Sequence, residues 1–240
     1  MHNLPHTLRP IPWTGGQPPP PLPRGTAAPL VLLLHGGAQV AAETENQLLA
    51  NLSLQERQRH ATYQRSAAQA RFLLARASLR QLLGHWLQQP AATIPIEADL
   101  LGKPRCPTAG APAFNLSHSG DLILLAFHAT AEVGVDVEQA RPNLQWERIA
   151  RRWLTPAEVA ELRALPQAEQ GRGFLAAWCR LEARVKASGQ GLGGIAGSGA
   201  AAVHLWDVRV PMGYAAAAAL RALTAPGESV ARAGHPSPLA

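Results

Sequence analysis

Three strand-length apolar runs lie close together in the middle of the chain, and they constrain the fold more than any other feature. Ala113 to Leu116 and Leu122 to Phe127 are joined by a short polar segment, which predicts a β-hairpin. Val133 to Glu138 follows after a turn and alternates apolar with polar residues, as a strand with two different faces does. With helical segments before and after them, these runs predict an α+β protein.

Helical periodicity and further strand-like runs flank this central region. The predicted helices span residues 53–86, 144–154, 155–165 and 174–188. Further strands are predicted at 30–34, 202–208 and 214–220. A helix followed by strands thus occurs twice, which favours two similar α+β halves.

The 240 residues are 47% hydrophobic, enough to bury a sizeable core. Residues 1–29 contain four consecutive prolines and little apolar periodicity, so we expect a disordered leader. The tail, residues 224–240, lacks any pattern and is also expected to be disordered. The two halves are then residues 30–130 and 131–223.

The charge balance limits the classes of molecule that the protein is expected to bind. Lysines and arginines number 22 against 16 acids, a net charge of +6 that favours nucleic acid, a phosphate-rich small molecule or an acidic protein. We find no nucleic-acid motif and few aromatic residues to stack bases. The chain also lacks the G-x-S-x-G turn of a serine hydrolase. No apolar run reaches the roughly 18 residues of a membrane helix, and two cysteines give no disulfide framework, so we expect a cytoplasmic protein.

A pair of carboxylates lies on the strand after the hairpin. Alternation puts Asp136 and Glu138 on one face, with Cα atoms roughly 6.5 to 7 Å apart, and two valines on the other. Such a pair is either a solvated strand edge or a site for a hard cation such as Mg²⁺, completed by phosphate oxygens. We expect both acids to face solvent.

The helix at 174–188 presents an apolar stripe and two charged residues beside it. The stripe consists of Phe174, Trp178, Leu181 and Val185. Glu182 and Lys186 lie one turn apart on the neighbouring face. They form either an ordinary surface ion pair, or a third carboxylate and a cation for charge that develops on a phosphate.

Two smaller features could bind an anion. Ser117, His118 and Ser119 are expected in the hairpin turn, where hydroxyls, imidazole and loop amides can converge, although such residues are common in turns. Lys103, between Gly102 and Pro104, either reaches a phosphate or is simply exposed.

In this order, the segments resemble the signature of the Sfp-type 4'-phosphopantetheinyl transferases. The motifs are Phe114–Ser119, Gly134–Glu138, and Trp178-x-x-x-Glu182-Ala183-x-x-Lys186. The lysine at 103 and the arginine-rich helix around Arg71 also fit, and the likeness covers residues 50–222.

The resemblance implies a fold and an activity. The fold is two similar α+β halves in a pseudo-twofold arrangement, with coenzyme A bound between them. The activity is that of a holo-[acyl-carrier-protein] synthase, which moves the 4'-phosphopantetheine arm of coenzyme A onto a serine of an apo acyl or peptidyl carrier protein and releases adenosine 3',5'-bisphosphate. We expect a monomer.

The resemblance also implies roles for individual residues. Asp136, Glu138 and Glu182 would hold Mg²⁺, and Lys186 would contact the phosphate. Either Glu182 or Glu138 would take the serine proton. The expected coenzyme-binding residues are Ser117 and His118 at the phosphates, with Lys103, Arg71 and Arg59 at the adenine and ribose-phosphate end.

One position departs from the family pattern. Leu181 stands where the family often has lysine, and Arg180 or Arg184 could supply the missing charge. The alternative function is therefore a catalytically weakened module that binds coenzyme A or a carrier protein.

A basic helix face is the expected docking surface for an acidic carrier protein. It comprises Arg148, Arg151 and Arg152 beside Trp153. Its alternative is an ordinary solvated helix face.

Overall fold

The structure is a computed structural model that describes residues 6–15, 17–25, 27–36, 42–64, 66–100, 102–142, 144–189 and 203–222. Its helices are α1 Ala42–Ala50, α2 Leu54–Ala61, α3 Ser66–Leu87, α4 Trp146–Trp153, α5 Pro156–Ala164 and α6 Gln167–Ser188, with a 3₁₀ turn at Ala91–Thr93. Its strands are β1 His6–Leu8, β2 Ile11–Pro12, β3 Leu30–His35, β4 Glu97–Ala98, β5 Pro104–Arg105, β6 Ala113–Ser119, β7 Leu122–His128, β8 Ala131–Gln139, β9 Val203–Val208 and β10 Tyr214–Ala222. The predicted disordered tail lies outside the described residues.

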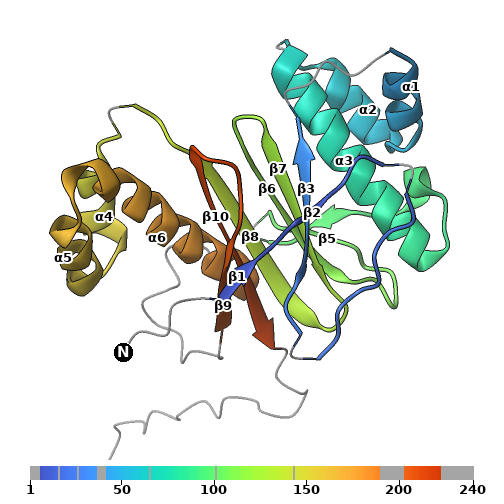
Figure 1. The fold of residues 1–240 in the computed structure, drawn as a ribbon. Helices are drawn as coiled ribbons and strands as arrows, with labels where there is room; N and C mark the ends of the chain where they lie inside the picture. The colour runs from blue at the N-terminus through green and yellow to red at the C-terminus, as the bar shows by residue number, and fades with distance from the viewer. Residues whose placement is uncertain are drawn as a thin grey trace, which may run out of the picture.

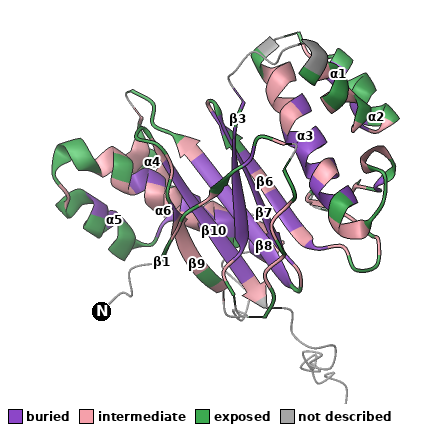
Figure 2. Ribbon diagram, turned by 45° about the vertical axis from the view of Figure 1, so that its right-hand side comes forward, coloured by how far each residue is buried: buried purple, intermediate pink, exposed green. Residues whose placement is uncertain are grey.

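Two four-stranded sheets form the centre of the molecule. The N-terminal sheet has the order β2-β3-β7-β6 and the C-terminal sheet the order β1-β9-β10-β8. Apolar side chains of both sheets, such as Leu33, Leu124 and Val135, pack between them. The helix α3 covers the outer face of the N-terminal sheet, and α6 covers that of the C-terminal sheet (Figure 1). The result is a mixed α+β fold whose buried residues concentrate in the central strands (Figure 2).

The chain follows the same route through each sheet. In both, a strand is followed by helices and then by two antiparallel strands, the last of which lies in the middle of the three: β3-β7-β6 and β8-β10-β9. An additional short strand pairs in parallel at one edge of each sheet, β2 beside β3 and β1 beside β9.

The described part of the N-terminal segment belongs to this core, so the expectation of a disordered leader over residues 1–29 is wrong for that part. Its two short strands join different sheets and cross the front of the molecule in Figure 1. Trp13 is only 3% exposed and packs against α3 and the N-terminal sheet. The indole of Trp86 donates a hydrogen bond to the Pro20 carbonyl at 3.2 Å. The sequence pattern does not predict these contacts, because each involves a single residue and produces no apolar periodicity.

The other predicted helices and strands are found with corrected ends, except that the helix predicted over residues 53–86 is divided into α2 and α3, and α1 was not predicted. The α5 helix begins with the predicted capping box at Thr155, and Gly189 ends α6 in the left-handed conformation, φ 67°. The predicted hairpin is present, but its turn is only Gly120 and Asp121. The segment Ser117–Ser119 was wrongly expected in the turn and instead continues β6.

The strand β8 is buried on both faces. Its valines point between the sheets, and its other face lies against α6. A Cβ atom on Gly134 would lie 2.0 Å from the Ala183 carbonyl oxygen and 2.5 Å from the Ala187 nitrogen. Glycine is therefore required here because the α6 backbone approaches β8 directly.

Side chains satisfy the edge of β8 that faces β6. The backbone N–H groups of Val135, Val137 and Gln139 donate to the side-chain oxygens of residues on β6. The three acceptors are Asn115 at 2.9 Å, Ser117 at 3.4 Å and Ser119 at 3.0 Å. This β6–β8 seam joins the two sheets without a backbone ladder, and it pairs edge groups that would otherwise be buried and unsatisfied.

Among the described residues, no helix is both long enough and apolar enough to cross a membrane.

Candidate active site

The acidic pair lies at the centre of the molecule, on the face of β8 that meets α6. Asp136 is only 4% exposed, so the expectation that it faces solvent is wrong, whereas Glu138 is half-buried. The Ser117 hydroxyl donates to Asp136 Oδ1 at 2.9 Å, and the Ser119 hydroxyl donates to Glu138 Oε2 at 2.9 Å. Both carboxylates are therefore held by β6.

The α6 helix supplies the other two charges. Lys186 Nζ lies 2.7 Å from Asp136 Oδ1 and also donates to the Val135 carbonyl at 3.3 Å. The alternative of an ion pair with Glu182 is therefore not what the structure shows. Glu182 forms no hydrogen bond or ion pair with any described residue. Burial, together with the charges of Asp136 and Glu138, raises the pKa of Glu182 despite the opposing Lys186 ammonium.

His118 points to the opposite face of β6 from Ser117, because successive side chains alternate. Burial lowers the pKa of His118, and the nearby charges of Arg71 and Lys186 lower it further. The imidazole is therefore neutral at pH 7 and surrounded by cations, an arrangement that favours a bound anion.

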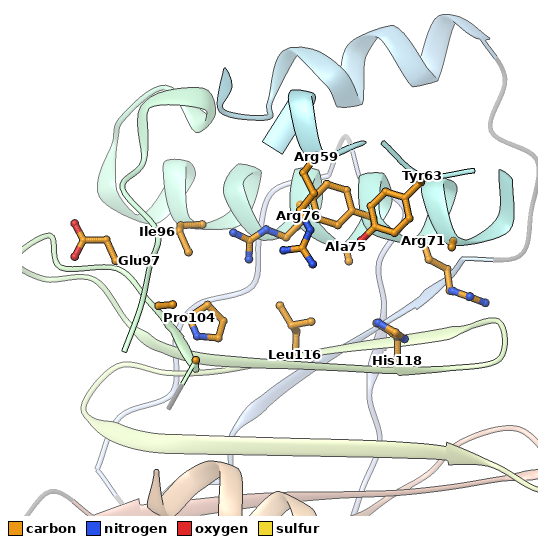
Figure 3. Close-up of a pocket in the computed structure, with 14 residues that line it drawn as sticks. Arg59, Tyr63, Arg71, Ala75, Arg76, Ile96, Glu97, Pro104, Leu116 and His118 are labelled. Atoms are coloured by element: carbon orange, nitrogen blue, oxygen red, sulfur yellow. The ribbon is translucent and has the colours of Figure 1, made fainter. Parts of the chain in front are cut away.

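Two cavities meet at His118. The acidic cavity, of about 420 Å³, is lined by Leu116, Ser117, His118, Asp136, Glu138, Trp178, Glu182 and Lys186. The basic cavity, of about 510 Å³, lies beneath α2 and α3 and shares Leu116 and His118 with the first. Figure 3 shows three arginine side chains reaching from these helices toward β6: Arg59, Arg71 and Arg76. The lining thus changes from mainly cationic in one cavity to mainly anionic in the neighbouring cavity.

The basic cavity also has an aromatic wall. Tyr63 and Phe72 lie with ring centroids 5.3 Å apart, and the Arg59 guanidinium sits 5.3 Å from the Phe72 centroid. Arg71 donates to the Gly120 carbonyl at 2.8 Å, which ties the helix to the hairpin turn. This combination of flat apolar rings and guanidinium groups suits a phosphorylated aromatic ligand.

Lys103 occupies a different place from the one expected. Its neighbours Gly102 and Pro104 line the basic cavity, but Lys103 Nζ turns away and makes three contacts within the protein. They are Glu132 Oε2 at 2.9 Å, the Val133 carbonyl at 3.1 Å and the Lys186 carbonyl at 2.8 Å. Its side chain is 9% exposed. In this structure Lys103 fastens the end of α6 to β8, and the geometry does not place it on a ligand.

The three carboxylates suit a hard cation by their chemistry. No group of three or more His, Cys, Asp or Glu side chains in the described residues is close enough to form a complete metal site. Asp136 Oδ2, however, is buried and accepts no hydrogen bond from a described residue. An unpaired buried carboxylate oxygen is costly, and a cation would relieve that cost.

The position of Leu181 is explained by packing. Leu181 is 5% exposed and belongs to the core between α6 and the C-terminal sheet. Arg180 does not replace the family lysine, because it forms a two-point ion pair with Asp207 at 2.8 and 2.7 Å. Arg184 is exposed.

Sequence reasoning missed several lining residues. Arg76, Tyr63 and Phe72 were not assigned to a site, and Trp178 was assigned only to the apolar stripe. A signal was present on α3, because Ala68, Arg71, Phe72, Ala75 and Arg76 follow the i, i+3, i+4, i+7, i+8 spacing of one helix face.

The basic cavity and the acidic cavity share Leu116 and His118, and together their side chains suit a ligand that carries phosphate. The profile of the 4'-phosphopantetheinyl transferase superfamily matches residues 132–225. The comparisons therefore confirm the resemblance to the 4'-phosphopantetheinyl transferase superfamily that the motifs carry.

Individual relatives agree with this. The 4'-phosphopantetheinyl transferase HetI of Nostoc sp. is 34% identical over 148 residues, which are 60% of this chain and 62% of the relative. The enzyme AcpT of Salmonella typhimurium is 44% identical over 89 residues, 37% of this chain and 46% of the relative. The enzyme Sfp of Bacillus subtilis is 27% identical over 154 residues, 64% of this chain and 67% of the relative. The chain thus spans less than two thirds of the HetI and AcpT sequences.

Proposed function

We propose that the protein transfers the 4'-phosphopantetheine arm of coenzyme A to a serine of an apo acyl or peptidyl carrier protein, releasing adenosine 3',5'-bisphosphate. One observation carries this proposal: the basic and acidic cavities share His118 and Leu116. Such a pair of cavities fits a ligand with an aromatic base and a phosphate at one end, in the basic cavity, and a pyrophosphate further along, in the acidic cavity.

The basic cavity would bind the nucleotide end. Arg59 and Arg71 offer planar donors to phosphate oxygens, whereas Arg76 is paired with Glu56. The Tyr63 and Phe72 rings offer a stacking surface for adenine. Lys103 is left out of this binding set because its amine is engaged elsewhere.

The acidic cavity would bind the pyrophosphate with Mg²⁺. Asp136, Glu138 and Glu182 would hold the ion, and the ion would neutralise charge on the phosphate oxygens. Lys186 lies in the same cavity and can contact the phosphate that leaves.

The carrier serine would lose its proton as its oxygen attacks the β-phosphorus and the bond to the departing bisphosphate breaks. Glu182 is better suited than Glu138 to accept that proton. It has no hydrogen-bond partner among the described residues, whereas Glu138 already accepts a bond from Ser119.

We further propose the setting in which the enzyme acts. It would work as a cytoplasmic monomer, and the basic face of α4 would dock an acidic carrier. Arg148, Arg151 and Arg152 are exposed there, although Arg151 also pairs with Glu147 at 3.1 Å. The repeated strand order and the equal 22-residue lengths of α3 and α6 support a pseudo-twofold relation between the halves.

To test this, the protein is incubated with coenzyme A, Mg²⁺ and each of several apo carrier proteins, and the mass of each carrier is measured by mass spectrometry. We expect a phosphopantetheine adduct that depends on coenzyme A and is lost with Glu182→Gln. An inactive protein that still binds coenzyme A would support the alternative of a binding module. Full activity of the variant would contradict the assigned site.

A further inference from the structure

We propose that Ser117 and Ser119 are positioning residues that set the geometry of the acidic pair. This inference rests on the proposed function and concerns the same site. It adds an indirect role through Asp136 to the phosphate contact expected of Ser117.

Besides a hydrogen bond that Ser117 accepts from Lys186 Nζ at 3.5 Å, each serine hydroxyl makes the same two contacts. Each hydroxyl accepts a hydrogen bond from a backbone N–H group of β8. It donates a hydrogen bond to the carboxylate of the residue that immediately precedes that N–H group in the sequence. Ser117 bonds Val137 N and Asp136 Oδ1, and Ser119 bonds Gln139 N and Glu138 Oε2. A hydroxyl has one proton to donate, so these bonds define its direction.

Burial restricts the orientations that the serine hydroxyls and the acids can adopt. Both serines are 8% exposed, and the hydroxyl of each is engaged by an acid of β8. Ser117 and Lys186 together bind Asp136 Oδ1, which leaves Oδ2 as the unpaired oxygen. The serines thus determine which carboxylate oxygens are free for a cation, as second-layer hydrogen bonds do in metal sites.

Asn115 provides a natural control within the same seam. It accepts a hydrogen bond from Val135 N at 2.9 Å, whereas the acids are bonded by Ser117 and Ser119. Loss of Asn115 therefore weakens the junction of the sheets without releasing a carboxylate. Ser119 is the better serine to change, because it holds the half-buried Glu138 near the end of β8.

The experiment measures Mn²⁺ binding to the full chain by titration calorimetry, with and without coenzyme A, alongside thermal unfolding. We expect Ser119→Ala to weaken Mn²⁺ binding about 10- to 100-fold, and Ser119→Thr to restore it. Asn115→Ala should lower the unfolding temperature yet bind Mn²⁺ like the parent. In turnover, Ser119→Ala should raise the Mg²⁺ concentration needed for half-maximal rate much more than it lowers the rate at saturating Mg²⁺.

Two results would overturn the inference in different ways. If Ser119→Ala and Asn115→Ala lower the unfolding temperature alike and both bind Mn²⁺ like the parent, the serines are only structural and the proposed function is unaffected. If the parent itself binds no Mn²⁺, with or without coenzyme A, the proposed metal dependence fails and the positioning role fails with it.

Discussion

The closest backbone approach in the site is at Gly134, and it allows a quantitative prediction for Gly134→Ala. The new Cβ would lie 2.0 Å from the Ala183 carbonyl oxygen, whereas ordinary contact begins at 3.4 Å. The helix α6 must therefore move away by roughly 1.4 Å, because its backbone cannot rotate aside as a flexible side chain can. Overpacking of this kind costs about 3 kcal/mol or more.

The same displacement would reach the charged residues. Lys186 lies on the helix that must move, and its Nζ is 2.7 Å from Asp136 Oδ1, so the retreat breaks that contact. A misplacement of about 1 Å commonly costs roughly 100-fold in rate. We expect the variant to unfold about 6 to 12 °C lower and to modify a carrier about 100-fold more slowly.

A matched control exists on the same helix. A Cβ on Gly171 would meet no atom within 4 Å, so Gly171→Ala should be neutral or stabilise the protein by about 0.5 to 1 kcal/mol through helix propensity. Chemical denaturation and the carrier mass assay should be run on both variants. If Gly134→Ala lies within about 1 kcal/mol of the parent and remains fully active, the argument from close packing is refuted.

Three further predictions follow from other parts of the structure. Trp13→Ala should lower the free energy of unfolding, measured by chemical denaturation, by about 3 to 5 kcal/mol. An unchanged denaturation midpoint would show that Trp13 does not anchor the N-terminal segment to the core. Although burial opposes it, the Arg76 charge holds the pKa of Glu56 below its ordinary 4.5, so the stabilisation is present above that pH and is lost as pH falls through the folded value. Unfolding temperatures of Glu56→Gln should therefore fall less than those of the parent between roughly pH 5 and pH 3; equal slopes would contradict this. Reversing the charges of Arg148 and Arg151 should slow carrier modification most at low salt, and unchanged kinetics would reject the docking face.

Much of the fold follows from local patterns. Alternation predicts the two faces of β8, and the capping box at Thr155 predicts the start of α5, because both signals depend only on residues near each other in sequence. The pattern fails at Ser117 to Ser119. Polar residues there suggest a turn, whereas in the structure they are polar because they pair with the edge of another strand.

Long-range contacts explain the other differences. The reach of Lys103 to the Lys186 carbonyl joins residues 83 positions apart, and no local pattern contains that information. Motif order brings Asp136, Glu138 and Glu182 to one cavity, yet only the packing of α6 on Gly134 shows that Asp136 is buried. Sequence therefore predicts which residues gather, while their burial and partners depend on tertiary packing.

The free edge of β8 links the stability of the fold to the proposed chemistry. Lys103 and Lys186 bind its carbonyl groups at 133 and 135, and three side chains of β6 bind its N–H groups. If another strand paired with this edge, backbone groups would occupy the positions that these side chains take. Because side chains close it instead, the junction of the two sheets can carry hydroxyl and ammonium groups directly beside the acidic pair, and the site is built where the halves meet.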